Sequence, residues 1–322
     1  MAPLPFNMAV MEFLADHRTA FLTHFFLAAT YLGDTGGYIL IATLIYVAWN
    51  KQLAVRLSMV VLLASSLNVV LKLILKNPRP FVREGNYFEK WAVSPRAAQG
   101  LAAQYSTPSG HAMAAAAFYP CLYKSVKRSY LRVIAVLAVV LIGISRPYLG
   151  VHYAEDVLIG WAIGLGVAWI GIKYAAAIDD LWRRLSYTQQ VGVAVAGGMA
   201  LWLLTIALNG WQINGQPREA LCDAGFLAGI VLARPLELRM VNFDPKSLNV
   251  PAKLLRYLLS IAMTAGTMLI SGWAAGLIPA GLILLANLFE FLRFAAAGFV
   301  IIFLAPLLFT RIGLAEGRPA GV

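Results

Sequence analysis

Runs of 15 to 22 predominantly apolar residues recur along this chain, and they limit its folds more than any other feature. A helix needs about 20 apolar residues to cross the hydrocarbon core of a bilayer. Only 13% of the 322 residues are charged, which is about half the fraction usual for soluble domains. The sequence therefore predicts an all-α, polytopic bundle of transmembrane helices and excludes a water-soluble core.

The apolar runs divide the chain into three segments. Residues 1–35 are expected to form interfacial helices, although a first span across 19–33 is also compatible with the sequence. Residues 36–189 would form a catalytic core, and residues 190–322 would add transmembrane helices of unknown role. About nine spans are predicted, at 36–50, 57–76, 108–123, 131–145, 156–177, 191–208, 221–235, 257–275 and 294–310. Residues 282–293 are expected to lie along the membrane surface before the last span.

The basic residues indicate how the helices are oriented. The predicted spans place 16 Lys and Arg residues against 5 Asp and Glu residues on one side of the membrane, and 10 against 10 on the other. Loops rich in Lys and Arg stay in the cytoplasm, so topology explains the net charge of +11 without nucleic-acid binding. The two cysteines, Cys121 and Cys222, are too few for a disulfide framework and lack metal-ligand spacing.

The segment SRPYLGVHYAED, at residues 145–156, carries the first candidate catalytic residues. His152 and Asp156 are four residues apart, a spacing that would place them on one face of a helix. There the carboxylate can accept the Nδ1–H of the imidazole and leave Nε2 as a nucleophile. Arg146 adds a planar guanidinium that suits a phosphate group. Alone, the segment fits a loop arginine and a surface histidine equally well.

Two further segments place phosphate-binding residue types at span ends. Lys72 and Arg79 lie in KLILKNPRP, and Ser109, Gly110 and His111 lie in PSGH at the start of a predicted helix. The N–H groups of a helix N-terminus favour an anion, and the glycine lets it approach closely. Lys72 and Arg79, together with Arg146, could neutralise the charge of a phosphoryl group in transfer. His111 could protonate the leaving oxygen. All three segments are predicted to lie at one non-cytoplasmic mouth.

Together the segments match the motifs KX6RP, PSGH and SRX5HX3D, and over roughly residues 36–177 the chain resembles the type 2 phosphatidic acid phosphatase (PAP2) superfamily. The resemblance implies an integral-membrane phosphatase that works through a phosphohistidine, without a metal or another cofactor. It implies that His152 is the nucleophile, that Asp156 orients it and that His111 is the general acid. The phosphate-binding residues would be Lys72, Arg79, Ser109, Gly110 and Arg146.

The sequence leaves several substrates open. A lipid phosphate or isoprenoid diphosphate is expected, such as undecaprenyl diphosphate, phosphatidylglycerophosphate or phosphatidate, with the site on the extracytoplasmic face of a bacterial inner membrane. Five aromatic residues beside the motifs favour entry of a lipid from the bilayer: Phe81, Tyr87, Phe88, Trp91 and Tyr105. A lipid-linked phosphotransferase and a sugar-phosphate phosphatase remain alternatives. The spans disfavour a vanadium haloperoxidase, and the intact motifs disfavour a non-enzymatic transporter or scaffold.

Overall fold

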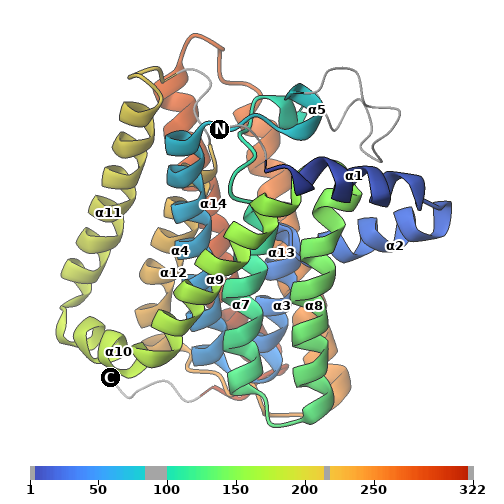
Figure 1. The fold of residues 1–322 in the computed structure, drawn as a ribbon. Helices are drawn as coiled ribbons and strands as arrows, with labels where there is room; N and C mark the ends of the chain where they lie inside the picture. Colours follow the sequence, from blue (N-terminus) through green and yellow to red (C-terminus); the bar gives the residue numbers. More distant parts are fainter. Residues whose placement is uncertain (1–3, 84–99, 214–217, 318–322) are drawn as a thin grey trace. The chain divides into compact units, whose positions relative to one another are not determined.

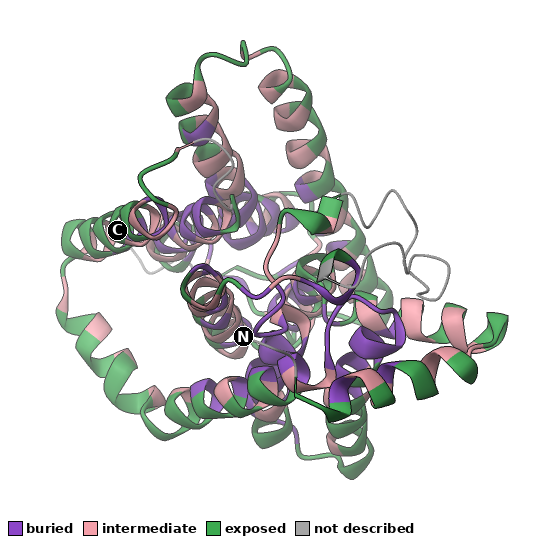
Figure 2. Ribbon diagram, turned by 45° about the horizontal axis from the view of Figure 1, so that its top comes forward, coloured by how far each residue is buried: buried purple, intermediate pink, exposed green. Residues whose placement is uncertain are grey.

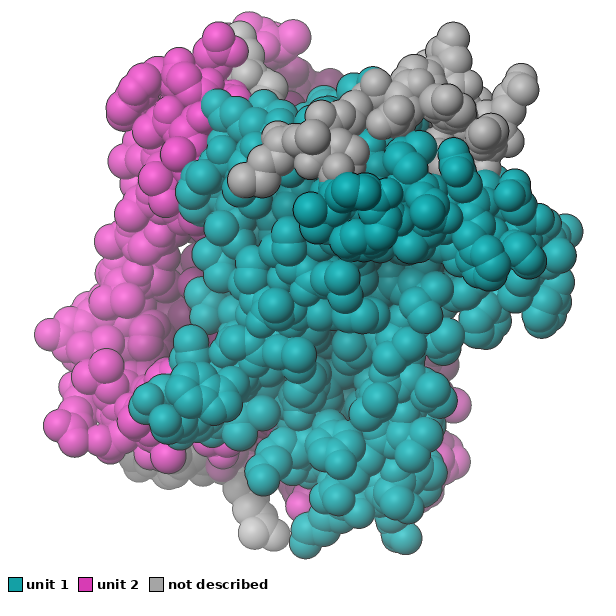
Figure 3. Space-filling view, viewed as in Figure 1, with its two compact units in different colours: residues 1–38, 63–175 teal, residues 39–62, 176–322 magenta. Residues whose placement is uncertain are grey.

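The computed structural model describes residues 4–83, 100–213 and 218–317. Within these ranges the chain is helical, and the only β-type pairing there is an isolated bridge between Phe243 and Gly317. The all-α fold predicted from the sequence is confirmed. The chain divides into two compact units, shown in Figure 3. Unit 1 comprises residues 1–38 and 63–175, and unit 2 comprises residues 39–62 and 176–322.

Unit 1 contains the helices that carry the three motifs. They are α1 (Phe6–Asp16), α2 (Ala20–Tyr31), the first turn of α3 (Thr35–Ala48), the C-terminal half of α4 (Lys51–Leu75), α5 (Pro80–Arg83), α7 (Gly110–Ser125), α8 (Ser129–Tyr148) and α9 (Ala154–Lys173), as Figure 1 shows. Helix α7 packs against α8 and α9, and its residues 112–119 are all buried. Buried residues are purple in Figure 2. Helix α7 is therefore the core of this unit.

Two glycines let α7 and α9 approach each other closely. A Cβ atom at Gly164 would lie 2.2 Å from the carbonyl oxygen of Met113 on α7. A Cβ atom at Gly160 would lie 2.8 Å from the carbonyl oxygen of Ser109. Both distances are shorter than van der Waals contact, so only glycine fits at either position. This interface fixes the distance between the N-terminal ends of α7 and α9.

The N-terminal helices α1 and α2 pack against the motif-bearing helices. Both contact α8, and α1 also contacts α9. The buried Asn7 side chain on α1 accepts a hydrogen bond from the Glu155 backbone N–H at 3.1 Å. The Arg18 guanidinium, between α1 and α2, donates to the Tyr148 carbonyl oxygen at 3.4 Å. The two helices therefore brace the connection between α8 and α9.

Unit 2 contains the remaining helices. They are the rest of α3 and α4, α10 (Ala175–Arg184), α11 (Tyr187–Leu208), α12 (Glu219–Met240), α13 (Val250–Ala275), α14 (Ile283–Phe299), the π-helix η2 (Val300–Leu304) and α15 (Ala305–Arg311). Glycines again permit close packing, because Cβ atoms at Gly225 and Gly229 of α12 would lie 2.2 and 2.1 Å from carbonyl oxygens of α14. The segment boundaries at 35/36 and 189/190 remain predictions from the sequence.

The described helices support a multi-pass membrane protein. Six are long and apolar enough to cross a bilayer, and α2 with α3, bent by 57°, gives up to seven. The expectation of about nine spans is not confirmed, since α7 has only 16 residues and α12 carries charged residues toward both of its ends. The expected surface location of residues 282–293 is not supported, because residues 283–293 are part of one candidate span from Ile283 to Arg311. Exposed apolar residues on α8, such as Val133 and Leu137, suit a lipid-facing surface.

Candidate active site

The three motifs meet at one end of unit 1, where the C-terminal ends of α4 and α8 adjoin the N-terminal ends of α7 and α9 (Figure 1). The Ser109 backbone N–H, from PSGH, donates to the Asp156 carbonyl oxygen at 3.0 Å. Arg79 Nη1, from KX6RP, lies 3.2 Å from His152 Nε2. These two contacts join segments far apart in the sequence into one polar cluster, as their positions at span ends predicted.

His152 lies in the turn between α8 and α9 rather than on a helix. Because α9 begins at Ala154, the prediction that His152 and Asp156 share a helix face is wrong. The turn nevertheless brings His152 Nδ1 to 3.5 Å from Asp156 Oδ2. Burial lowers the pKa of His152 well below its ordinary value of 6.5, and the charges of Arg79 and Arg146 act in the same direction. The imidazole is therefore neutral near pH 7 and keeps a lone pair.

Arg79 identifies which imidazole nitrogen carries that lone pair. Its guanidinium is buried and donates to the Gln104 carbonyl oxygen at 3.2 Å, the Gln104 side-chain oxygen at 3.1 Å and the Val151 carbonyl oxygen at 3.0 Å. Arginine can only donate hydrogen bonds, so His152 Nε2 accepts from Arg79 Nη1 and the proton is on Nδ1. This is the tautomer that a nucleophilic Nε2 requires.

Asp156 is held by more partners than the motif suggested. Its Oδ2 accepts from the Ser106 hydroxyl at 2.6 Å and from the Tyr153 backbone N–H at 2.8 Å, and its Oδ1 accepts from the Thr107 hydroxyl. Ser106 Oγ also lies 3.2 Å from His152 Nδ1. Sequence reasoning missed Ser106. It suited Thr107 to a helix cap before Pro108, but α7 begins at Gly110 with Ser109 as its N-cap, and Thr107 donates to Asp156 instead.

Two buried donors in the predicted phosphate-binding set have no hydrogen-bond partner among the residues that the structure describes: Ser109 Oγ and Arg146 Nε. A buried donor without a partner costs stability, and phosphate oxygens would satisfy both. Arg146 is held in place by α2, because its Nη1 donates to the Thr30 hydroxyl. Thr30 lies in no motif and was also missed. Lys72 is half-buried on the last turn of α4.

Gly110 and His111 are the first two residues of α7, at the same end of the unit. A Cβ atom at Gly110 would lie 3.0 Å from Asn68 Oδ1. Asn68 also donates to the Pro108 carbonyl oxygen at 3.0 Å and so ties α4 to PSGH. Packing against Asn68 is therefore one reason for glycine at this position. Close approach of an anion to Gly110 remains a prediction.

The aromatic residues predicted to lie at the membrane interface are described only in part. Phe81 is buried and packs in an apolar cluster with Met11, Tyr148 and Val151, so the prediction is wrong for this residue. Tyr105 is half-buried. The other three, Tyr87, Phe88 and Trp91, lie outside the described residues.

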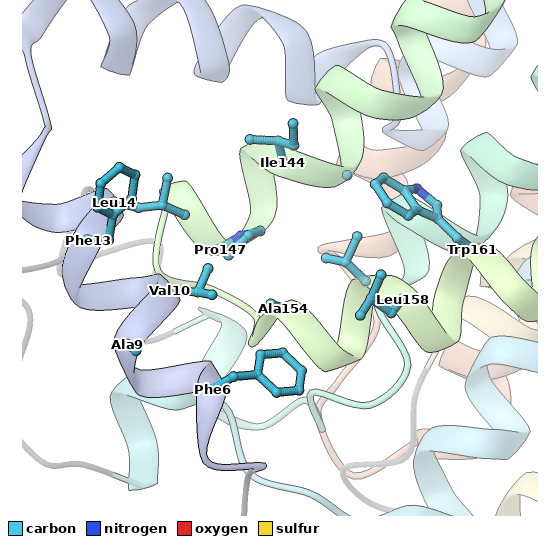
Figure 4. A pocket seen from close by; sticks show the side chains of 12 residues that line it. Phe6, Ala9, Val10, Phe13, Leu14, Ile144, Pro147, Ala154, Leu158 and Trp161 are labelled. Atoms are coloured by element: carbon cyan, nitrogen blue, oxygen red, sulfur yellow. The ribbon is translucent and has the colours of Figure 1, made fainter.

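A groove lined by apolar and aromatic residues runs between α1 and the pair α8 and α9 (Figure 4). Its volume is ≈ 660 Å³. Val10 and Leu14 line it from α1, Pro147 from α8, and Leu158 and Trp161 from α9. Because its lining residues are apolar and aromatic, the groove offers few hydrogen-bond partners to an ordered water molecule. It is suited to a hydrocarbon chain.

Within the described residues, no group of three or more His, Cys, Asp or Glu side chains is placed to hold a metal ion. Cys121 and Cys222 are both free thiols, the first buried and the second half-buried. Neither is part of the polar cluster that surrounds His152.

Comparison with protein families agrees with the geometry of the site. Residues 53–179 match the PAP2 superfamily, and residues 222–317 match the transmembrane extension of PAP2 superfamily phosphatases. Together the two matches cover more than half of the 322 residues. The chain belongs to the PAP2 superfamily. All eight motif residues named from the sequence lie within the PAP2 match, and the resemblance first seen in the motifs is confirmed.

Three curated relatives are similar to parts of this PAP2 chain. Phosphatidylglycerophosphatase B of Bacillus subtilis is 43% identical over 70 residues, 19% of this chain and 34% of the relative. Glucose-6-phosphatase 3 of Mus musculus is 27% identical over 224 residues, 64% of each chain. Undecaprenyl-diphosphatase of Sulfolobus acidocaldarius is 25% identical over 125 residues, 38% of this chain and 56% of the relative. The chain thus spans between one third and two thirds of these relatives.

Two solved structures are also similar to this PAP2 chain. Aquifex aeolicus LpxE has a TM-score of 0.45 and 22% identity, and the match covers 54% of this chain and 99% of LpxE. A transmembrane PAP2-type phosphatidylglycerolphosphate phosphatase from Bacillus subtilis has a TM-score of 0.43 and 27% identity, covering 53% of this chain and 85% of that structure.

Proposed function

We propose that this protein is a membrane-embedded phosphatase that removes phosphate from a lipid phosphate or isoprenoid diphosphate through a phosphohistidine on His152. One observation carries the proposal. A neutral, buried imidazole, whose Nε2 accepts from Arg79 at 3.2 Å, lies in one cluster with two buried donors, Ser109 Oγ and Arg146 Nε. Neither donor has a hydrogen-bond partner within the described part of the chain. A nucleophile surrounded by cations and spare donors suits phosphoryl transfer.

The proposed reaction has two steps. His152 Nε2 attacks phosphorus in line, the bond from phosphorus to the leaving oxygen breaks, and His111 gives that oxygen a proton. Water then attacks the phosphohistidine and gives a proton back to His111, while the phosphorus–nitrogen bond breaks and inorganic phosphate leaves. Lys72, Arg79 and Arg146 neutralise the phosphoryl oxygens, a role that Mg²⁺ fills in many phosphoryl-transfer enzymes. We therefore expect no metal requirement.

The apolar groove favours a lipid over a soluble phosphate ester. Its walls are α8 and α9, the two helices whose connection carries His152, and Pro147 in its lining directly follows Arg146. We assign it to the hydrocarbon chain of the substrate, whose phosphate would then lie at the polar ends of these helices. The relatives named phosphatidylglycerophosphatase and undecaprenyl-diphosphatase are consistent with this class. The excess of basic residues on the opposite side favours an extracytoplasmic site.

A sugar-phosphate phosphatase is the second candidate, because glucose-6-phosphatase 3 aligns with 64% of the chain. The purified protein should be tested for phosphate release from undecaprenyl diphosphate, phosphatidate, phosphatidylglycerophosphate, lipid A and glucose 6-phosphate. We expect activity on one or more of the lipids. Release from glucose 6-phosphate alone would replace the lipid proposal with the second candidate. An added lipid or sugar alcohol that captures the phosphate in place of water would indicate a phosphotransferase.

The groove assignment has its own test. Val10→Trp fills the groove from α1, whereas Glu12→Trp places the same side chain on the exposed side of the same helix. Moving a methylene group of the substrate from water into an apolar environment is favourable by ~0.8 kcal/mol. The hydrocarbon chain of a lipid moves from the bilayer into the groove, so its gain in free energy is far smaller. We therefore expect only a several-fold loss of kcat/KM in Val10→Trp. The loss should be confined to a long-chain phosphate in mixed micelles and absent for its short headgroup analogue. Equal losses for both substrates, or in both variants, would remove the assignment.

A further inference from the structure

Ser106 lies between the nucleophile and its carboxylate. Its hydroxyl is 3.2 Å from His152 Nδ1 and 2.6 Å from Asp156 Oδ2, whereas the direct separation of Nδ1 and Oδ2 is 3.5 Å. A hydroxyl both donates and accepts, so it can accept the Nδ1–H and donate to the carboxylate. We propose that Ser106 is a positioning residue, through which Asp156 orients and stabilises His152. This inference rests on the proposed function.

The surroundings of Asp156 support this arrangement. Its two oxygens already accept from the Thr107 hydroxyl and the Tyr153 backbone N–H. These contacts fix the carboxylate independently of His152. The 3.5 Å between His152 Nδ1 and Asp156 Oδ2 is at the limit for a direct hydrogen bond. Ser106 is itself fully buried, and its backbone N–H donates to the Asn77 carbonyl oxygen at 2.7 Å. The hydroxyl is therefore held at a defined place between its two partners.

The interposed hydroxyl has a chemical consequence during the reaction. When the bond between Nε2 and phosphorus forms, the imidazole gains a positive charge and the Nδ1–H becomes a stronger donor. The Ser106 oxygen then accepts more strongly, and its own O–H is polarised toward Asp156. The carboxylate thus stabilises the phosphohistidine without taking its proton. The charge disappears again when water breaks the phosphorus–nitrogen bond.

Two variants separate this role from simple support of the carboxylate. Ser106→Ala removes the hydroxyl between His152 and Asp156. Thr107→Val also removes a hydroxyl that donates to Asp156, but the structure does not place this hydroxyl beside His152. We expect kcat to fall by about 10- to 100-fold in Ser106→Ala, as for other residues that orient a functional histidine, with KM nearly unchanged. Thr107→Val should lose clearly less. Ser106→Thr keeps the hydroxyl and should recover most of the activity.

A measurement without substrate keeps the test independent of the proposed activity. The chain has four histidines, so the His152 Nδ1–H signal of ¹⁵N-histidine-labelled protein can be assigned by comparison with His152→Ala. In Ser106→Ala we expect this signal to move upfield and to exchange faster with water, and in Thr107→Val to stay in place. If Ser106→Ala fails to fold, Ser106→Cys offers the same shape with a much weaker hydrogen-bonding group and should show the same changes.

The outcomes are distinguishable. Equal kcat losses in Ser106→Ala and Thr107→Val, or an unshifted Nδ1–H signal in Ser106→Ala, would overturn the role of Ser106. A wild-type protein that releases no phosphate from any substrate would refute the proposed function instead. In that case the Nδ1–H signal alone would decide whether Ser106 positions His152.

Discussion

Replacing Gly164 by alanine tests how closely the two halves of the site must be held together. The added Cβ would lie 2.2 Å from the Met113 carbonyl oxygen, whereas ordinary contact begins at 3.4 Å. Helices α7 and α9 would have to separate by about 1 Å, and misplacement by that amount can cost about 100-fold in rate. Helix α7 carries PSGH and α9 carries Asp156, so the separation acts directly on the site. Overpacking should also destabilise the fold by about 1–3 kcal/mol.

The matched control is Gly166→Ala on the same helix, because Gly166 is exposed and has nothing within 4 Å of its Cβ position. Phosphate release from a long-chain substrate in mixed micelles gives kcat, and thermal unfolding followed by tryptophan fluorescence gives Tm. We expect Gly164→Ala to lose about 100-fold in kcat and to unfold at a lower temperature. Gly166→Ala should match the wild type in both. A Gly164→Ala protein with wild-type kcat and Tm would refute the idea that this contact sets the geometry of the site.

Four further predictions follow from the proposed mechanism. Brief incubation with labelled substrate should trap an acid-labile, alkali-stable adduct that is absent in His152→Ala. In His111→Ala the adduct should form slowly, and its rate of formation should fall least for substrates whose leaving group needs no proton. An adduct that still forms in His152→Ala would contradict the assignment of His152 as the nucleophile. Activity should survive EDTA and be inhibited by vanadate, and loss on chelation that Mg²⁺ restores would show a metal requirement. Because burial lowers the pKa of His152, the neutral nucleophile persists below pH 6.5, and the acid limb of kcat/KM should lie below that value rather than at it. In a background without Cys121 and Cys222, an impermeant thiol reagent on intact cells should label Ala103→Cys but not Lys127→Cys, and the reverse result would invert the topology.

The sequence named the motif residues that the structure brings together, but not the residues that support them. Lys72, Arg79 and His152 could be named because phosphate chemistry restricts the residue types and the motif spacing is specific. The contacts of Ser106 and Thr107 with Asp156 depend on how the segment before α7 folds back onto the start of α9. No periodicity or spacing rule reports such a contact.

The number of spans was harder to predict than the helices themselves. Hydropathy marks an apolar run but does not say whether its surroundings are lipid or protein. Helix α7 is apolar because it is buried among other helices. In α14, the charges at Glu290 and Arg293 suggested a surface segment, but these two side chains pair at 3.2 Å within one long helix. Pairing lowers the cost of charges inside a span.

The bracing of the α8–α9 connection by α1 and α2 has a consequence for how a catalytic domain is delimited. The PAP2 match begins at residue 53, yet Asn7 holds the start of α9 and Thr30 holds the guanidinium of Arg146. A chain that begins at residue 53 would keep every motif residue but lose these contacts from α1 and α2. The residues proposed to carry out the chemistry therefore lie within the family match, whereas some of the residues that hold them in place lie before it. An inactive fragment that retains all three motifs would be the natural result of cutting at the family border.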